Sequence, residues 1–465
     1  MCEESPDPVG RRHIMYVTEL ELSGVRGFHG ERAARLRFPR REDGSHAGWT
    51  VLAGRNGSGK TTVLQALALA VQGPAVTHAL FKEAGDWVTR GARKAVVEAR
   101  VVGPDHVDAR WVSTDSLTDD WFPEAGSVRL VWERLTNRGE SHVRLRRPTT
   151  AKAFELQRRA ESGPWQETPQ GWLCLGYGPY RRLDGGASAR YVSAERAERL
   201  ATLFDESACL AEGVTWLIDQ HLRSLEGRTG ARELVEAVKL LLADGLLPDD
   251  HEVTGVDSDG LWVNTPRGVL ALRSMSDGYR SVTALVVDIV RHLQGAYGDL
   301  RVEERDGHPV IPMPGVVLID EVDAHLHVSW QKRIGQWMKR HFPEIQFIVT
   351  THSPYICQAA DPGGLIRLAG PTEKRPPQVV DEELYRRVVY GSGDDAILSD
   401  LFGVDSPYSE RADALRRRLA AMEFRVLDEQ ASEEELAEYR RLSAQLNSSL
   451  SARVTEVATH LGRDE

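Results

Sequence analysis

One motif near the N-terminus constrains the fold of this chain more than any other feature. Residues 54–61 read Gly-Arg-Asn-Gly-Ser-Gly-Lys-Thr, which is the pattern G-x-x-x-x-G-K-[ST]. The apolar run 49–53 before it predicts a short buried strand, and the run 63–69 after it favours a helix. This strand–loop–helix context predicts a phosphate-binding loop in an α/β fold, with an ordinary glycine-rich turn as the alternative.

The residue types in the motif suit the binding of a nucleoside triphosphate. Glycines let backbone N–H groups turn inward around anionic oxygens, and the following helix directs its positive N-terminus at the same phosphates. Lys60 supplies a charge for the β- and γ-phosphates, and the Thr61 hydroxyl is placed to ligate Mg²⁺. The predicted ATP contacts in this segment are Gly54, Arg55, Asn56, Gly57, Ser58, Gly59, Lys60, Thr61 and Thr62.

Two later strands are predicted to end in reactive side chains. Residues 316–319 are four apolar β-formers followed by Asp320 and Glu321, and the run 345–351 ends at His352. Asp320 would hold Mg²⁺ through water, and Glu321 would orient or deprotonate the attacking water. His352 can reach a γ-phosphate through its ring N–H. Acids or a histidine with a purely structural role at a strand end are the alternatives.

Two histidines lie in the loop between these strands. His325 and His327 are spaced i, i+2, and no third metal ligand is in view. We therefore favour packing and interface hydrogen bonds over metal binding for this pair.

A serine–glycine turn opens a second apolar helix further along the chain. Residues 275–279 read Met-Ser-Asp-Gly-Tyr and precede the apolar run 282–290. Such a turn offers a second anion site at a helix N-terminus, although a well-capped helix start is the alternative.

The order of these motifs resembles the ABC-type ATPase superfamily, in the branch with SMC-like, Rad50-like, RecF-like and OLD-like proteins. In that resemblance, residues 54–61 are Walker A and residues 275–279 are the signature. Asp320 and Glu321 are Walker B, Asp323 belongs to the D-loop, and His352 is the switch histidine. No Q-loop glutamine stands at a recognisable position.

The resemblance implies a head-to-tail homodimer, or a higher oligomer, in which two ATP and Mg²⁺ sites lie between the heads. Ser276, Gly278 and Asp323 would then contact the nucleotide held by the partner's loop. The opening segment 20–28 is similar to the first strand of this branch, which implies that Arg26 contacts nucleotide.

The fold class expected is α/β: a split ABC-type P-loop head with a mixed β-sheet and flanking helices, an inserted β-rich and helical lobe, and a C-terminal helical hairpin. The predicted parts are 14–92 and 265–375 for the head, 93–264 for the inserted lobe and 376–465 for the helical tail. Strands are expected within 93–147 and helices at 208–225, 231–242, 408–428 and 432–460.

Ile397-Leu398 and Phe402-Gly403 form an I-L-x-x-x-F-G segment that precedes the two expected tail helices, and 177–182 is a stretch with tyrosine, glycine and arginine. Both features resemble ATPase subunits of Septu-type anti-phage systems, which implies a separate HNH-type nuclease as partner. Residues 360–465 contain no apolar strand ending in D-x-D, so no intrinsic nuclease is expected. A DNA-repair ATPase of RecF or SMC type and a nucleotide-locked DNA-binding scaffold are the alternative functions.

Charge and composition restrict where nucleic acid could bind. The formal net charge is -11, so contact with DNA or RNA requires a local basic patch, for which 137–147 is the candidate. Arg181 and Arg182 follow a predicted buried strand and could approach a nucleotide or a partner, or lie on a surface loop. Few, scattered cysteines and the lack of a long uncharged apolar run favour the cytoplasm over secretion or a membrane.

Overall fold

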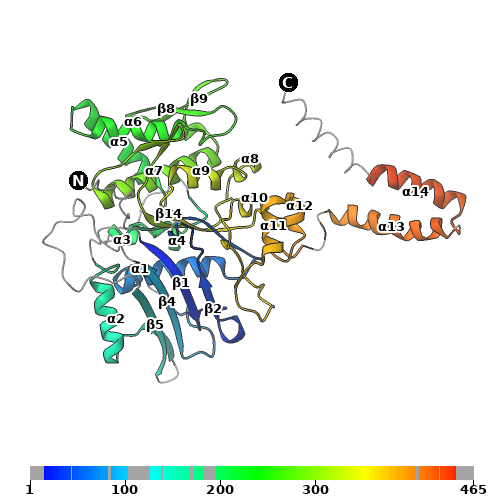
Figure 1. Ribbon diagram of the computed structural model, residues 1–465, viewed down its shortest axis with the longest axis horizontal. Coiled ribbons are helices and arrows are strands. Elements are labelled where there is room, and N and C mark those ends of the chain that lie inside the picture. Colours follow the sequence, from blue (N-terminus) through cyan, green and yellow to red (C-terminus); the bar gives the residue numbers. More distant parts are fainter. Residues whose placement is uncertain are drawn as a thin grey trace, which may run out of the picture. The chain divides into compact units, whose positions relative to one another are not determined.

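The computed structural model (Figure 1) divides the chain into two compact units, residues 1–396 and 397–465. It describes residues 15–42, 44–81, 85–102, 126–137, 140–166, 172–181, 195–404, 406, 408–428 and 430–446.

A six-stranded mixed sheet forms the centre of the first unit. Its order is β16-β15-β3-β14-β13-β7, and only the edge strand β16 runs antiparallel to its neighbour. The strands are β3 (Gly48–Ala53), β7 (Cys174–Tyr177), β13 (Gly315–Ile319), β14 (Ile345–Thr351), β15 (Leu365–Arg367) and β16 (Gln378–Val379). Both faces of the central strands are covered, which explains their continuous apolar sequences. Parallel pairing brings the carboxyl ends of β3, β7, β13 and β14 to one edge of the sheet.

A second, antiparallel sheet has the order β2-β1-β4-β5-β6. Its strands are β1 (Tyr16–Ser23), β2 (Ala34–Arg37), β4 (Lys94–Val102), β5 (Gly126–Asn137) and β6 (Glu140–Leu145). Alternate residues of β4 are buried, as expected for a sheet with one face on the core. Helix α1 (Lys60–Leu80) contacts both sheets and joins them into one core.

Helix α1 is long and apolar enough to cross a membrane, and it is the one such helix in the described part of the chain. Two-thirds of its apolar window is buried inside the protein, and its first turn carries Lys60 and Thr61. It is therefore a core helix of the protein, and it directly follows the glycine-rich loop 54–59.

The strands expected in an inserted lobe are not separate from the N-terminal head. β4 pairs with β1 from Tyr16↔Val102 to Ser23↔Val96, so 93–147 extends the sheet that the N-terminal strands begin. The compact units also divide at 396/397 rather than at 375/376. Long-range strand pairing decides this grouping, and the four-part division of the chain otherwise remains a prediction.

The rest of the insert forms helices and a small antiparallel sheet. Helices α5 (Ala211–Leu225) and α6 (Ala231–Ala243) confirm the expected pair, and β8 (Glu252–Asp257), β9 (Gly260–Thr265) and β10 (Gly268–Ala271) follow. The remaining elements of this unit are η1 (Gly30–Arg32), α2 (Ala151–Glu161), α3 (Glu195–Glu198), α4 (Ala201–Phe204), η3 (Leu272–Ser274), α7 (Asp277–Tyr297), β11 (Glu303–Arg305), β12 (His308–Val310), α8 (Val328–Gln331), α9 (Ile334–His341), α10 (Pro354–Cys357), α11 (Glu382–Tyr390) and α12 (Gly393–Ile397).

The second unit is a helical hairpin of α13 (Glu410–Leu427) and α14 (Glu433–Leu446). Six apolar side chains form its small core: Leu415, Leu419, Met422, Tyr439, Leu442 and Leu446. The two expected tail helices are thus confirmed, and the end of the second prediction, 447–460, lies outside the described residues.

A buried ionic network connects helix α7 to strand β7. Asp288 accepts a hydrogen bond from the Tyr177 hydroxyl at 2.9 Å and pairs with Arg291 at 3.1 Å. His292, which is buried beside them, accepts from the Arg291 guanidinium, so its ring must be neutral. Burial lowers the pKa of His292 to about 4, although the Asp288 carboxylate acts in the opposite direction.

This network predicts a pH-dependent contribution to stability. Because the unfolded chain takes up a proton on His292 near pH 6.5 and the folded chain only near pH 4, stability should fall as the pH is lowered through that window. Relative to His292→Gln, the wild type should lose up to about 3 kcal/mol between these pH values. Urea unfolding of both proteins at several pH values measures the difference, and parallel pH profiles would contradict the prediction.

Candidate nucleotide-binding site

The loop between β3 and α1 has a conformation that requires its glycines. Gly57 and Gly59 have φ of 75° and 97°, which side chains with a Cβ rarely adopt. A Cβ on Gly59 would lie 2.7 Å from the Phe28 ring, and one on Gly54 would lie 2.6 Å from the Leu368 carbonyl oxygen. Phe28 and Leu368, which directly follows β15, thus limit the space on either side of the loop.

Two side chains of the loop suit an anionic ligand. The Lys60 Nζ donates to the Gly54 carbonyl oxygen at 2.9 Å, so the amine lies across the loop. Burial lowers the pKa of Lys60, and the nearby Asp320 and Glu321 carboxylates partly offset this effect. The Ser58 hydroxyl is buried and has no hydrogen-bond partner. Because buried polar groups are normally paired, an unpaired hydroxyl in this loop fits a site for phosphate oxygens.

Two threonines from different strands converge on Asp320 at the end of β13. The Thr61 hydroxyl donates to Asp320 Oδ2 at 2.6 Å, and the Thr350 hydroxyl donates to Oδ1 at 2.5 Å. Asp320 is only 2% exposed. A hydroxyl and a carboxylate are oxygen ligands of the kind that Mg²⁺ prefers, so Thr61 and Asp320 fit the predicted metal site.

Glu321 lies on the same edge in an uncommon backbone conformation. Its φ is 45°, in the left-handed region, and its N–H donates to the Thr350 hydroxyl at 2.8 Å. Such a conformation in a residue other than glycine is held by its surroundings and is common at functional sites. The side chain is half-buried and is therefore accessible to water.

Arg181 supplies much of the support for this turn. Arg181 is 4% exposed. Its guanidinium donates to the carbonyl oxygens of Asp320 at 2.8 Å and Glu321 at 3.0 Å, with a longer contact to Val322 at 3.5 Å. It also donates to the Gly178 carbonyl oxygen at 2.8 Å. Burial lowers the pKa of Arg181 to about 10.

The structure corrects the sequence interpretation of this arginine. The surface-loop alternative is wrong for Arg181, and Arg182 lies outside the described residues. The buried strand before a Gly178-Pro179 turn was a visible signal, but its role depends on β7 pairing with β13, with Ile319 beside Tyr177. That pairing joins segments far apart in the chain.

The switch histidine and the D-loop acid follow neighbouring strands. His352 follows β14 and is exposed, whereas the Asp323 carboxylate accepts from the Thr351 hydroxyl at 2.5 Å. Burial and the nearby Lys60 ammonium lower the pKa of His352, and the carboxylates of this edge raise it less. His352 is thus near the loop lysine and is neutral at pH 7.

The signature turn packs on the loop that follows β13. Gly278 is required there, because a Cβ would lie 2.5 Å from the His325 carbonyl oxygen. Ser276 is the exposed N-cap of α7, and its hydroxyl caps no backbone N–H. Among the described residues, no hydrogen bond joins Ser276 to the phosphate-binding loop of its own chain.

The loop histidines have local structural contacts. His325 has φ of 66°, and His327 caps α8 by accepting from the Ser329 N–H at 3.4 Å. The described residues contain no group of three His, Cys, Asp or Glu placed to bind a metal ion.

Arg26 lies against the first turn of α1. Its guanidinium donates to the Thr62 hydroxyl and the Gln65 side-chain oxygen, each at 3.3 Å, and stacks 5.2 Å from the centre of the Trp87 ring. Burial lowers the pKa of Arg26. Arg26, the predicted contact residue, thus lies beside the loop and against the helix that follows it.

The fold and this edge of the sheet are similar to those of an ABC-type ATPase head. Two families match its two halves: one described as "AAA domain" matches residues 19–98, and one described as "AAA domain, putative AbiEii toxin, Type IV TA system" matches residues 226–358. The chain thus resembles AAA-domain ATPases and, among named relatives, the Septu protein PtuA.

The similarity to individual relatives covers parts of them. The chain is 26% identical to Septu protein PtuA of Bacillus mycoides (strain KBAB4) over 67% of this chain and 35% of the relative. It is 30% identical to Septu protein PtuA of Bacillus thuringiensis over 44% of this chain and 50% of the relative. A probable ATPase of retron Ec83 from Escherichia coli is 42% identical over 20% of this chain and 16% of the relative. The chain therefore spans about a third to a half of the PtuA relatives.

Solved structures of SMC heads are also similar. The SmcHead bound to the C-winged helix domain of ScpA matches with a TM-score of 0.41 and 18% identity, covering 78% of this chain and 97% of that one. The SMC head domain from Thermotoga maritima matches with a TM-score of 0.37 and 15% identity, covering 78% and 99%.

Proposed function

We propose that this chain binds ATP with Mg²⁺ and hydrolyses it. The observation that carries the proposal is the convergence of Thr61 and Thr350 on the buried Asp320, beside Lys60 and Glu321. Residues 54–62 hold the phosphates, with Arg26 beside them, and Thr61 and Asp320 hold the metal ion. Bound Mg²⁺ would neutralise phosphate charge during hydrolysis.

The catalytic roles belong to Glu321 and His352. Glu321 activates the attacking water, because its half-buried carboxylate lies directly after the metal-binding Asp320. His352 is neutral and exposed near Lys60, so its ring N–H is available to a γ-phosphate oxygen.

We further propose that two heads dimerise head to tail on ATP. The exposed, non-capping hydroxyl of Ser276 and the tight turn at Gly278 support a signature that faces another copy. Ser276, Gly278 and Asp323 would complete the partner's nucleotide site.

The similarity to Septu protein PtuA supports a role in anti-phage defence. We place this role in the cytoplasm and propose a separate HNH-type nuclease as the regulated partner. No nuclease activity is assigned to the chain itself. Contact with DNA or RNA through a local basic patch is part of the same proposal.

Changing the signature serine tests both the activity and the dimer. The wild type should release phosphate from ATP with Mg²⁺ and stop when EDTA removes the metal. Ser276→Arg should still bind ATP, but it should neither dimerise on ATP nor turn over, because the bulky cation blocks the second site. Light scattering and phosphate release measure the two effects.

Arg273→Ser, a change at an exposed position just before the signature, is the control. Dimerisation of Ser276→Arg on ATP would show that the signature does not form the interface.

A further inference from the structure

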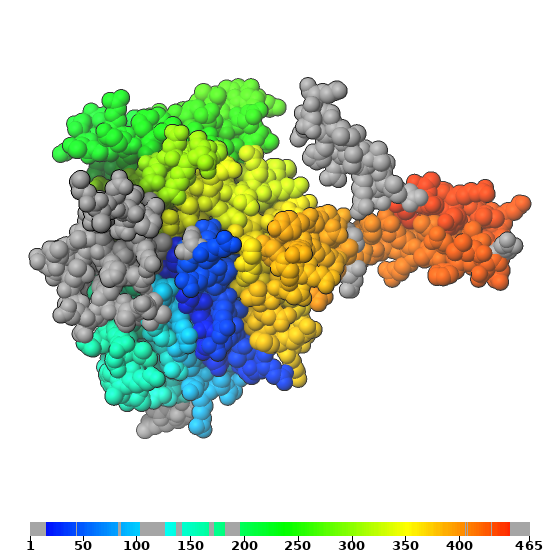
Figure 2. All heavy atoms as spheres, in the orientation of Figure 1, coloured from blue at the N-terminus to red at the C-terminus, as the bar shows by residue number. Residues whose placement is uncertain are grey.

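A basic cavity of about 320 Å³ lies between one face of the antiparallel sheet and helix α2, which is at the molecular surface (Figure 2). Five cationic side chains from β4, β5, α2 and the segment after β6 line it: Lys94, Arg129, Arg146, Arg147 and Lys152. Among the described residues, no carboxylate lines this cavity. The cavity therefore concentrates positive charge in an otherwise acidic chain.

These cations are only weakly neutralised. Arg129 is 3.6 Å from Glu98, and Arg146 donates to the Thr149 hydroxyl at 3.3 Å. Within the described part of the chain, Lys94, Arg147 and Lys152 form no ion pair. Cations that converge without counter-charges attract a polyanion, because bringing in phosphates relieves their mutual repulsion.

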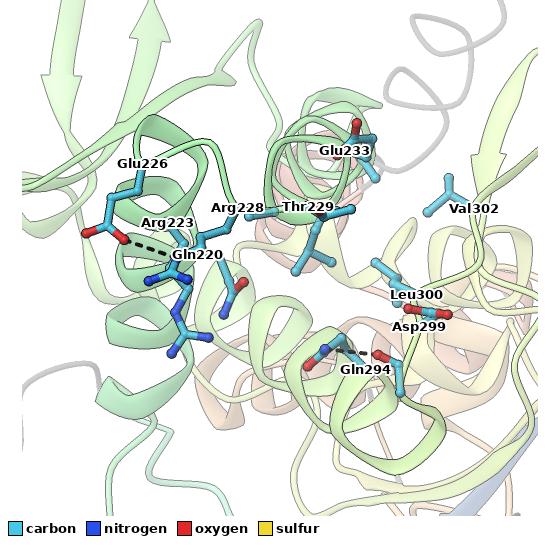
Figure 3. Close-up of a pocket in the computed structure, with 15 residues that line it drawn as sticks. Gln220, Arg223, Glu226, Arg228, Thr229, Glu233, Gln294, Asp299, Leu300 and Val302 are labelled. Atoms are coloured by element: carbon cyan, nitrogen blue, oxygen red, sulfur yellow. Dashed lines mark hydrogen bonds and ion pairs between the residues drawn. The ribbon is translucent and has the colours of Figure 1, made fainter.

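In a second, larger cavity, which we call the balanced cavity, the positive charges are paired with negative ones. It has a volume of about 850 Å³ and lies between the ends of α5, α6 and α7 (Figure 3). Its Arg228 pairs with Glu226 at 3.5 Å, and its Arg223 pairs with Asp219 at 2.9 Å. Both arginines of this cavity are therefore paired with acids, whereas beside α2 only Arg129 of the five cations is, among the described residues.

The walls of the basic cavity are partly apolar. Val96, Val131, Leu156 and Trp165 contribute to it. The Trp165 indole is fixed, because its N–H donates to the Ala70 carbonyl oxygen at 2.9 Å. A fixed aromatic wall among cations suits the flat face of a nucleobase next to its phosphates. The volume is at the lower end of that of small-ligand sites, which suits a nucleotide unit.

We propose that this cavity binds a nucleotide unit of single-stranded nucleic acid. A duplex keeps its bases paired and stacked, so only its backbone could reach the cations, whereas a single strand can insert a base as well. Arg146 and Arg147 contact phosphates, and Trp165 and Leu156 contact the base. This inference rests on the nucleic-acid part of the proposed function and does not require ATP hydrolysis.

Binding of a labelled oligothymidine to the full chain tests the site by fluorescence anisotropy. The double variant Arg146→Gln/Arg147→Gln should bind about tenfold more weakly or worse, and its slope of log affinity against log salt should fall by about 1.4, about 0.7 for each lost phosphate contact. The matched control is Arg223→Gln/Arg228→Gln, which removes the same charge at the balanced cavity and should bind like the wild type. Absence of binding by the wild type, or equal losses in both double variants, would overturn the proposal.

Two further arms identify the source of the ligand. Duplex DNA of the same length should bind the wild type more weakly, and free thymidine monophosphate should not displace the oligothymidine at comparable concentrations. Equal binding of duplex, or displacement by the mononucleotide, would overturn a single-strand site. ATP turnover should be unchanged in both double variants, so a failure of this inference and a failure of the ATPase proposal give different results.

Discussion

Replacing Glu321 with glutamine should reduce phosphate release about 100-fold or more while ATP binding is retained. The amide has nearly the shape of the carboxylate but cannot accept a proton from water. The substitution leaves the loop lysine and both proposed metal-binding side chains in place. Glutamine also keeps the backbone contact to Thr350, which is made by the residue 321 N–H rather than by its side chain. Steady-state phosphate release and equilibrium binding of a labelled ATP analogue measure the two effects.

The control for this change is Glu303→Gln, on the short strand β11. This variant loses the same charge and should turn over ATP like the wild type. Unchanged turnover in Glu321→Gln would remove Glu321 from the role of catalytic base. Loss of ATP binding along with turnover would instead point to a role in holding the nucleotide.

Replacing Arg181 with methionine should lower kcat roughly 100-fold with little change in KM, since small displacements of a catalytic group have effects of this size. Among the described residues, the Arg181 guanidinium donates its hydrogen bonds to backbone carbonyl oxygens. It acts as a positioning residue, because it donates to the carbonyl oxygens of Asp320 and Glu321 and so fixes the turn that carries both side chains. Arg181→Lys should recover part of the rate, because an ammonium can make some of these bonds.

Arg196→Met is the matched control for this prediction. Arg196 is also buried, burial lowers its pKa to about 10 as well, and it donates to Gln72 and to the Pro164 carbonyl oxygen, away from the Walker B turn. If both methionine variants lose activity and thermal stability equally, Arg181 contributes only to folding. A fall in kcat confined to the Arg181 variants, at matched stability, supports positioning.

Much of the head could be predicted because its motifs are local. The strand–loop–helix around Lys60 and the strand that ends in Asp320 and Glu321 are confirmed as β3, α1 and β13. In each case a short apolar run and the residues that directly follow it are sufficient, since burial and backbone geometry are decided within a few residues.

Features that depend on contacts between distant segments could not be predicted from such local patterns. The strands after residue 93 were expected to form a separate lobe, yet β4 pairs with β1. For Arg181 the sequence left two alternatives, a surface loop or contact with a nucleotide or partner. The structure instead shows its guanidinium bonded to the backbone of the turn at Asp320. The cations of the basic cavity are spread over residues 94–152, and only some of them belong to the predicted patch 137–147.

The sequence by itself predicted the glycine-rich loop at Lys60 and the strand that ends in Asp320 and Glu321, because these features depend on local geometry. Only the tertiary structure decided which side chains support these features. Strand order places β7 beside β13, and this pairing brings Arg181 to carbonyl groups about 140 residues away along the chain. The same holds for the cavity beside α2, where charges from four segments become neighbours only after the sheet and helix have packed. Pairing between distant strands depends on the whole core rather than on any local pattern, and for that reason it had to be observed.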